Sequence, residues 1–457
     1  MSGAQHQRDE AARAARAAAD AVYAQILARA PEHEPNPSTD RVREVCELLG
    51  DPQRAYRVVH LTGTNGKTST SRMVERLLRE HGLRTGRFTS PHLTRVNERI
   101  AIDGEPISDE RFVEVWHDVE PYIAMVDERS AQIGRPRLSF FEVFVVMAFA
   151  AFADAPVDVA VIEVGMGGSW DATNVADGEV AVITSVGLDH QQWLGDTILD
   201  IAEVKAGIVK DGATLVLAQQ EEDVEGVVLT VAAERGARVV REGVDIAVVE
   251  RQVAVGGQLL TLRGLGGVYA DVYLPLHGEF QAHNALLALA ATEALLTGGA
   301  ALDGDVVGTA FADVTSPGRL EVVRSSPTVV VDGAHNPHGA EALVASLDEA
   351  FAFDRLVGVV GVMADKDPEA ILSVLEPVLA EVVVTRASVP RAMEPDDLGE
   401  VAVDVFGEDR VHVVERLDDA IALAVERAES EVERGAGVLV TGSILVVAEA
   451  RVLLGRA

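Results

Sequence analysis

One short run constrains the fold of this chain most strongly, because it lies between a strand-like and a helix-like segment. Residues 57–61 have the composition of a buried strand. The apolar Met73, Val74, Leu77 and Leu78 share one face of a helix expected over 70–81. Between them, residues 63–68 read Gly-Thr-Asn-Gly-Lys-Thr. Backbone N–H groups at such a turn, with the positive end of the helix dipole, form a cradle for phosphate. The alternative is a glycine-rich turn with a solvated lysine.

The lysine of this run is unusual, because lysine is scarce among the 39 basic residues. Its side chain would add a flexible positive charge for phosphate, and the Thr68 hydroxyl would ligate magnesium. A glycine usually stands where this chain has Leu61, so the loop is a shortened variant. Either a primary amine is needed where the few lysines stand, or the composition of the chain simply favours arginine over lysine. The lysines of the chain are Lys67, Lys205, Lys210 and Lys366.

Composition limits the class of protein. The 457 residues, 48% of them hydrophobic, favour two domains with sizeable cores. A formal net charge of −34 argues against binding to nucleic acid or to anionic membranes. The single Cys46 cannot form an internal disulfide, and neither a signal peptide nor a membrane-spanning run is recognisable. We therefore expect a cytoplasmic protein with no membrane or nucleic-acid partner.

Strand-like and helix-like segments alternate along two parts of the chain, which predicts an α/β fold with mostly parallel sheets. We expect an N-terminal helical extension (1–36), a central phosphate-loop domain (37–315) and a smaller Rossmann-like domain (316–457), with a hinge at Ser316-Pro317-Gly318. Short β-like runs between residues 237 and 275 indicate an antiparallel hairpin layer appended to the first sheet.

Several polar residues follow the expected strands of the central domain, where open α/β sheets bind ligands. Glu163 ends an apolar strand and could hold magnesium, although a buried glutamate satisfied by backbone donors is the alternative. The pair Asp189-His190 ends the next strand, and His190 is either a metal ligand or structural. Lys205 lies among apolar residues, and burial would lower its pKa enough for the neutral amine to react.

A family resemblance rests on the order and spacing of eight motifs from about Asp40 to the C-terminus. Together they resemble folylpolyglutamate synthase/dihydrofolate synthase, a member of the Mur-type amide ligases. The motifs are Gly63-Thr64-Asn65-Gly66-Lys67-Thr68, Thr89-Ser90-Pro91-His92-Leu93, Glu163-Val164-Gly165-Met166-Gly167-Gly168, Leu188-Asp189-His190, Lys205-Ala206-Gly207-Ile208, His283-Asn284, Ser316-Pro317-Gly318-Arg319 and Asp332-Gly333-Ala334-His335-Asn336-Pro337.

The resemblance implies ATP-dependent amide formation. A dihydropteroate or reduced-folate carboxylate takes the γ-phosphoryl group, and the amine of L-glutamate attacks the acyl phosphate. Two Mg²⁺ ions are implied, one held by Thr68, Ser90 and Glu163 and the other by Glu163 and His190, with Lys205 carbamylated as an oxygen ligand. The implied catalytic residues are Lys67, Lys205, His190, Arg319 and His335. The implied ATP-binding residues are Gly63, Thr64, Asn65, Gly66, Lys67, Thr68, Asn284, Arg319 and Asp332.

Further implied contacts surround these. His283 and Asn284 should lie near the nucleotide, Arg319 should reach the γ-phosphate, and Asp332 should contact the ribose. Lys366 either stabilises the incoming glutamate or is solvated. The family is usually monomeric.

The pterin side is less defined by sequence. Residues 88–99 resemble a long loop suited to covering a ligand, with Arg95 and Arg99 available for carboxylates. Phe140 and Phe141 either stack on the pterin or belong to the core.

Two positions depart from the family pattern. Ser169 stands where an arginine is usual, and Val204 where a glutamate usually precedes the lysine, with Glu203 one position earlier. Three alternatives therefore stay open: a Mur-type ligase for another carboxylate, an ATP-binding homologue with impaired turnover, and a nucleotide-dependent nucleic-acid protein, which the charge opposes.

Overall fold

The computed structural model describes residues 3–34, 36–430 and 435–456, and the chain divides into two compact units. Unit 1 comprises Met1–Ala247, Leu262–Tyr269 and Asn284–Phe311, and unit 2 comprises Val248–Thr261, Ala270–His283 and Ala312–Ala457. Residues 1, 2 and 35 of the expected extension, and 431–434 and 457 of the expected last domain, lie outside the described residues. The domain boundaries at 36/37 and 315/316 stay predictions.

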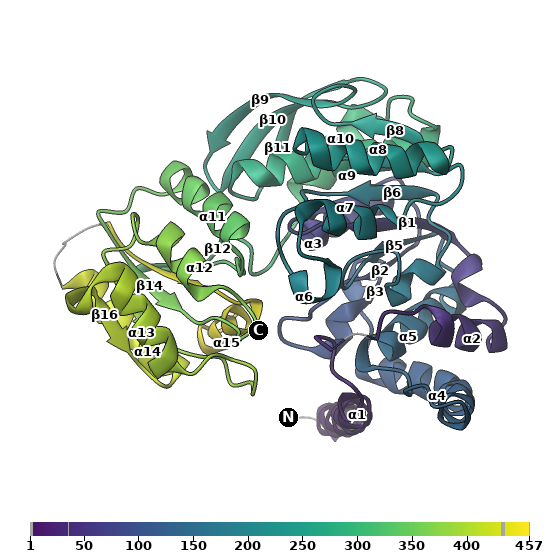
Figure 1. Cartoon of the computed structure of the whole chain (residues 1–457), viewed down its shortest axis with the longest axis horizontal. Helices are drawn as coiled ribbons and strands as arrows, with labels where there is room; N and C mark the ends of the chain where they lie inside the picture. The colour runs from purple at the N-terminus through teal and green to yellow at the C-terminus, as the bar shows by residue number, and fades with distance from the viewer. Residues whose placement is uncertain (1–2, 35, 431–434, 457) are drawn as a thin grey trace. The chain divides into compact units, whose positions relative to one another are not determined.

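An eight-stranded sheet forms the centre of unit 1 (Figure 1), in the order β4-β3-β2-β5-β1-β6-β7-β8. The five pairings from β2 to β8 are parallel, whereas β3 pairs antiparallel with both β2 and β4. The strands are β1 (Arg57–Thr62), β2 (Thr85–Phe88), β3 (Ile100–Ile102), β4 (Glu105–Pro106), β5 (Val159–Glu163), β6 (Val180–Ile183), β7 (Thr214–Leu217) and β8 (Arg238–Arg241).

Helices cover both faces of this sheet. Right-handed crossovers place α3 on the face opposite α7 and α8, because α3 connects strands in the opposite direction along the sheet. The helices are α1 (Gly3–Leu27), α2 (Asp40–Leu48), α3 (Lys67–Glu80), α4 (Asp109–Gln132), α5 (Phe140–Asp154), α6 (Gln191–Leu194), α7 (Ile198–Ala206), α8 (Glu222–Glu234), α9 (Glu279–Thr297) and α10 (Gly304–Ala312), with 3-10 turns η1 (Pro52–Arg54), η2 (Val96–Arg99) and η3 (Ala172–Val175).

The cores explain the helix patterns. The four apolar residues predicted for one face of α3 are all fully buried. Helix α5 is apolar on nearly every side and packs between the sheet and helices α1, α2 and α4. A capping box of Ser139 and Glu142 starts it, and Arg41 pairs with Glu142 in the interior at 2.8 Å.

A separate three-stranded sheet has the order β11-β10-β9. Its strands are β9 (Ala247–Ala254), β10 (Gly257–Arg263) and β11 (Val268–Leu274). The connections of two and four residues require antiparallel pairing, so the predicted hairpin layer is present. The first run expected in it, however, is β8, which instead forms the parallel edge of the eight-stranded sheet.

Unit 2 contains a six-stranded sheet in the order β12-β13-β17-β14-β15-β16, parallel except for β12. Apolar clusters lie on both faces. The α/β class predicted for both parts of the chain is confirmed. The elements are β12 (Glu321–Ser325), β13 (Thr328–Val331), β14 (Arg355–Val360), β15 (Glu381–Val384), β16 (Val411–Val413), β17 (Ala436–Thr441), α11 (Pro337–Ala350), α12 (Pro368–Leu375), α13 (Pro395–Phe406), η4 (Glu408–Arg410), α14 (Leu417–Glu429) and α15 (Ile444–Leu453).

Among the helices of the described residues, none combines the length and apolar character needed to cross a membrane.

Candidate active site

The glycine loop between β1 and α3 strongly favours glycine at two positions. Gly63 has φ +146° and Gly66 has φ +86°. A Cβ atom at residue 63 would lie 1.8 Å from Thr184 Oγ1, and one at residue 66 would lie 2.5 Å from Asn284 Oδ1. Thr184 Oγ1 also donates to Asn65 O at 2.6 Å. The end of β6 therefore holds the loop closely from one side.

Two lysines 138 positions apart in sequence converge on this loop (205 − 67 = 138). Lys67 Nζ donates to Gly63 O at 2.9 Å and to Thr64 O at 3.1 Å, and Lys205 Nζ donates to Gly63 O at 2.8 Å. Burial, and then the charge of Lys67, lower the pKa of Lys205 to about 7, against the opposing effect of Asp189 and Asp171. At neutral pH a large fraction of Lys205 is therefore an uncharged amine.

Thr68 and Glu163 form a compact set of oxygen donors beside the loop. Thr68 Oγ1 donates to Glu163 Oε1 at 2.8 Å and to Oε2 at 3.1 Å, and the Glu163 side chain is buried. The strand register explains why Thr68 and Glu163 lie close together, because Leu61 at the end of β1, just before the glycine loop, is paired with Glu163 at the end of β5. Hydroxyl and carboxylate oxygens are ligands that Mg²⁺ accepts.

The remaining predicted metal ligands come from neighbouring strands. Phe88 pairs with Ile162, so the buried Ser90 follows β2 at the level of Glu163. His190 caps α6 in a left-handed conformation, its Nε2 lying 3.9 Å from Asp189 Oδ2. Within the described part of the chain, no group of three or more His, Cys, Asp or Glu side chains is placed to hold a metal. The predicted set is of another kind, because it combines one carboxylate and one imidazole with hydroxyls and a modified lysine.

In unit 2, the structure brings three predicted residues together around the end of β13. Asp332 is buried and accepts from Leu320 N at 2.7 Å and Ala334 N at 2.8 Å. Burial raises the pKa of Asp332, and the nearby Arg319 opposes this effect. His335 Nδ1 lies 2.9 Å from Gly333 O.

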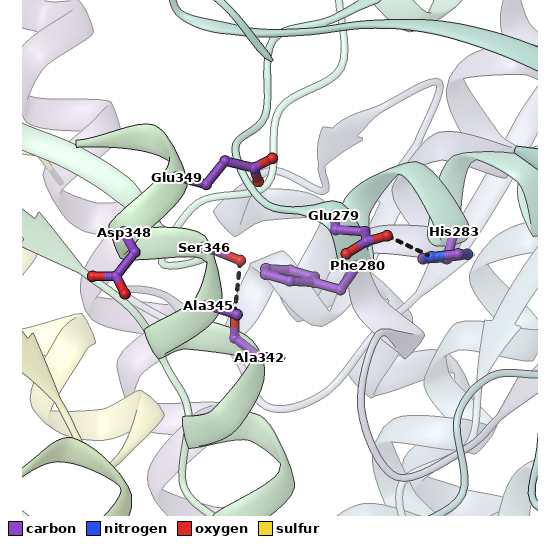
Figure 2. Close-up of a pocket in the computed structure, with 8 residues that line it drawn as sticks. All are labelled: Glu279, Phe280, His283, Ala342, Ala345, Ser346, Asp348 and Glu349. Atoms are coloured by element: carbon purple, nitrogen blue, oxygen red, sulfur yellow. Dashed lines mark hydrogen bonds and ion pairs between the residues drawn. The ribbon is translucent and has the colours of Figure 1, made fainter. Parts of the chain in front are cut away.

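A cavity of about 570 Å³ lies in unit 2, between the first turn of α9 and one face of α11 (Figure 2). His283 lines it, and the Glu279 carboxylate lies 3.9 Å from His283 Nε2. The neighbouring Asn284 faces the glycine loop in unit 1, as its distance to a Cβ at residue 66 shows. The other lining residues are Phe280, Ala342, Ala345, Ser346, Asp348 and Glu349.

The structure shows what surrounds Ser169 and Val204, the two departures from the family pattern. Val204 packs against the apolar cluster around α7 and α8, and its backbone oxygen accepts from Ser169 N at 2.8 Å. The Ser169 and Glu203 side chains are exposed. A Cβ at Gly168 would lie 2.6 Å from Val204 O, so the paired glycines allow this loop to lie against the end of α7.

Sequence reasoning missed two buried groups of the site. One is Thr184, whose role depends on contacts distant in sequence. The other is Asp171, which accepts from Met166 N at 3.0 Å and Thr173 N at 2.9 Å and so fixes the loop after β5. Burial raises the pKa of Asp171 to about 6. The Asp-x-Thr spacing, which favours an Asx turn, could have indicated Asp171.

The expectation that Arg99 is available for a ligand carboxylate is wrong for this structure, whereas the availability of Arg95, whose side chain is 37% exposed, stays a prediction. Arg95 pairs with Asp109, and Arg99 pairs with Glu32 at 2.8 Å. Phe140 and Phe141 are both buried, and a Cβ at Gly165 would lie 2.5 Å from the Phe141 ring. Both rings thus belong to the core, and Phe141 also contacts the site loop.

Known proteins share both the sequence and the fold of this chain. Residues 131–292 match the Mur ligase middle domain, and residues 318–444 match the Mur ligase glutamate ligase domain. The chain is 50% identical over 448 residues to the dihydrofolate synthase/folylpolyglutamate synthase of Mycobacterium tuberculosis, covering 94% of this chain and 92% of that protein. The enzyme of the same name from Bacillus subtilis is 32% identical, with coverages of 91% and 94%.

Solved structures of related proteins support the same family assignment. The Mycobacterium tuberculosis folylpolyglutamate synthase complexed with ADP superposes with a TM-score of 0.93 at 49% identity, covering 97% of this chain and 99% of that one. An FPGS–AMPPCP–folate complex superposes with a TM-score of 0.83 at 31% identity, with coverages of 96% and 100%. The chain therefore belongs to the folylpolyglutamate synthase/dihydrofolate synthase family of Mur ligases.

Proposed function

We propose that this protein is an ATP-dependent ligase that joins L-glutamate to the carboxylate of a dihydropteroate or a reduced folate. The observation that carries the proposal is the glycine loop itself, where two lysines share Gly63 O and a threonine–carboxylate pair lies beside them. That arrangement suits a triphosphate with its metal ion, and relatives solved with ADP or AMPPCP support it. The folate named in a relative's complex favours this carboxylate over that of another Mur-type substrate.

The reaction proceeds in two substitutions. A pteroate or folate carboxylate oxygen attacks the γ-phosphorus, and ADP leaves with the electrons of the broken P–O bond. The glutamate amine then attacks the acyl carbon, phosphate leaves, and the amine loses a proton. Lys67 and the loop amides hold the β- and γ-phosphates, which is the main task in such transfers because there is little covalent chemistry for the protein to perform.

We propose two Mg²⁺ ions at the ends of β1, β5 and β6. The donors fit a hard cation, because Thr68 and Glu163 already present oxygens to one another and Ser90 lies at the same level of the sheet. Magnesium bound there would neutralise phosphoryl charge. His190 is the proposed ligand from the β6 side.

We propose that Lys205 is carbamylated. Its amine bonds to a backbone oxygen, and its lowered pKa provides the neutral nucleophile that attacks CO₂, forming an N–C bond and releasing one proton. The product is anionic, so it would relieve the repulsion between Lys205 and Lys67. Arginine cannot form this group.

The roles of the unit 2 residues stay proposals. Asp332 is assigned to the ribose hydroxyls, Arg319 to phosphate and His335 to the glutamate step. Their shared position at the carboxyl end of β13 supports these roles, because open α/β sheets bind ligands there. We further propose a monomer acting in the cytoplasm, where ATP and L-glutamate are available, without a nucleic-acid partner. The charge of −34 supports the last point.

The test is ADP formation by purified protein with Mg²⁺, ATP and L-glutamate, with dihydropteroate and tetrahydrofolate in separate reactions. Controls omit the pterin or the glutamate. We expect ADP only when both co-substrates are present, and the pterin that supports turnover identifies the substrate. Silence with both pterins, while ATP still binds, would favour an impaired homologue, for which Ser169 and Val204 would be the first positions to restore.

A further inference from the structure

A buried ion pair connects the N-terminal extension to the loop after β2. Arg99, whose side chain is 2% exposed, donates through Nη2 to Glu32 Oε2 at 2.8 Å and through Nη1 to Glu32 Oε1 at 3.3 Å. Its Nε donates to His92 Nδ1 at 3.0 Å. Glu32 follows α1, whereas Arg99 and His92 lie 67 and 60 residues later in the chain (99 − 32 and 92 − 32).

Glu32 is the partner that makes the burial of Arg99 tolerable. The guanidinium lies 5.1 Å from the centroid of Phe140 and 5.5 Å from that of Phe144. An arginine in such apolar surroundings requires a carboxylate in bidentate geometry, because an unpaired buried charge is strongly destabilising. The Glu32 side chain is 31% exposed, so the pair has one deeply buried end and one end near solvent.

Arg99 in turn fixes the substrate loop, which we define as residues 89–95. Thr89 N donates to Arg99 O at 3.1 Å, and the His92 ring accepts from Arg99 Nε. The preceding residue, Glu98, accepts from the amides of three loop residues at 2.7 to 2.9 Å, namely Leu93, Thr94 and Arg95. The substrate loop is thus anchored through residues 98 and 99.

The segment carrying Glu32 is fastened to the body of unit 1. Phe140 N donates to Ala30 O at 2.9 Å, and Arg29 Nη1 donates to Asp127 Oδ2 at 2.9 Å. On the preceding helix, the ring of Tyr23 meets the His92 ring edge-on, with centroids 6.0 Å apart. The extension is therefore held by contacts with α4 and α5, and it also contacts the substrate loop.

We propose that Glu32 is a positioning residue for the substrate loop: through Arg99 and His92 it fixes residues 89–95, so that the N-terminal extension is a working part of the pteroate site. The proposal rests on the proposed function, because residues 89–95 belong to the loop, expected over 88–99, that would cover the pteroate. It assigns no contact between Glu32 and the substrate.

The test compares Glu32→Gln with Glu34→Gln in the full chain. The first substitution keeps the shape of the side chain and removes its charge, while Glu34, two residues later, is 66% exposed and serves as the matched control. For E32Q we expect KM for the pteroate to rise about tenfold, as loss of a charge-assisted bidentate pair can produce. Amide exchange of residues 89–95 should accelerate relative to β1 and β5. Glu32→Asp should be intermediate in both readouts.

A purely structural role would lower the melting temperature of E32Q while leaving KM and loop exchange of the folded enzyme unchanged, and that result would overturn the proposal. Equal effects in E34Q would overturn it as well. If E32Q does not fold, E32D tests the proposal instead, because its shorter side chain cannot keep the 2.8 Å contact without movement. Wild-type loop exchange and a wild-type KM for the pteroate in E32D would refute the proposal. If wild type turns over no pteroate, the proposed function fails, while loop exchange in the unliganded variants still tests positioning.

Discussion

Replacing Gly63 by alanine tests whether the phosphate loop is built as tightly as the structure indicates. The new Cβ would lie 1.8 Å from Thr184 Oγ1 and 3.0 Å from Thr184 Cβ. Thr184 cannot easily move, because it is buried in β-sheet surroundings and its hydroxyl bonds to Asn65 O. Alanine at the φ of +146° adds backbone strain.

The magnitude follows from a matched glycine. Gly212 also has a positive φ, +71°, but a Cβ there meets nothing within 4 Å. Both variants carry backbone strain of about 1–3 kcal/mol, partly offset by about 0.4–1 kcal/mol from the stiffer unfolded chain. Gly63→Ala adds overpacking of about 1–3 kcal/mol and the loss of a hydrogen bond worth about 1 kcal/mol. We therefore expect it to destabilise unit 1 by about 2–4 kcal/mol more than Gly212→Ala.

Urea unfolding followed by tryptophan fluorescence measures this difference, because the tryptophans at positions 116, 170 and 193 all belong to unit 1. The double variant Gly63→Ala/Thr184→Ala removes the clashing hydroxyl and should be more stable than the sum of its single variants predicts, by about 1–3 kcal/mol. Equal urea midpoints for the two glycine variants, or additive effects in the double variant, would refute the reasoning.

Three further predictions concern the chemistry of the site. Lys205→Arg should keep the fold but lose most ADP formation, because arginine cannot be carbamylated. Lys210→Arg should retain activity, because Lys210 Nζ donates to a backbone oxygen, Asn174 O, at 2.7 Å and has no proposed role in the reaction. Comparable turnover in both variants would defeat the carbamate. Burial raises the pKa of Asp171 to about 6, so as pH rises this carboxyl ionises in the unfolded chain before it does in the folded protein. Wild type should therefore lose stability relative to Asp171→Asn between about pH 4 and about pH 6, and the difference should level off at higher pH. A constant difference in urea midpoint across this range would contradict the pKa shift. Glu163→Gln should raise the Mg²⁺ concentration needed for half-maximal turnover by about 10–100-fold, measured by titration, and an unchanged requirement would remove Glu163 from the metal site.

Local patterns predicted the elements well. The strand over 57–61, the loop and the burial of the α3 face are confirmed, because side-chain periodicity and turn chemistry act over a few residues. Boundaries were less accurate. Helix α3 starts at Lys67, three residues before its expected start, and β8 belongs to a different sheet from the one predicted.

The sequence by itself determined the class of fold, the position of the phosphate loop and, through its motifs, the family. Only the tertiary structure decided which groups meet. It inserted β5 between β1 and β2, which brings Glu163 beside Thr68; it placed Lys67 and Lys205 on one carbonyl; and it gave Arg99 an internal partner in Glu32. The physical reason is that strand order and buried charge pairing depend on contacts between distant segments, whereas periodicity records only which face of each segment is buried.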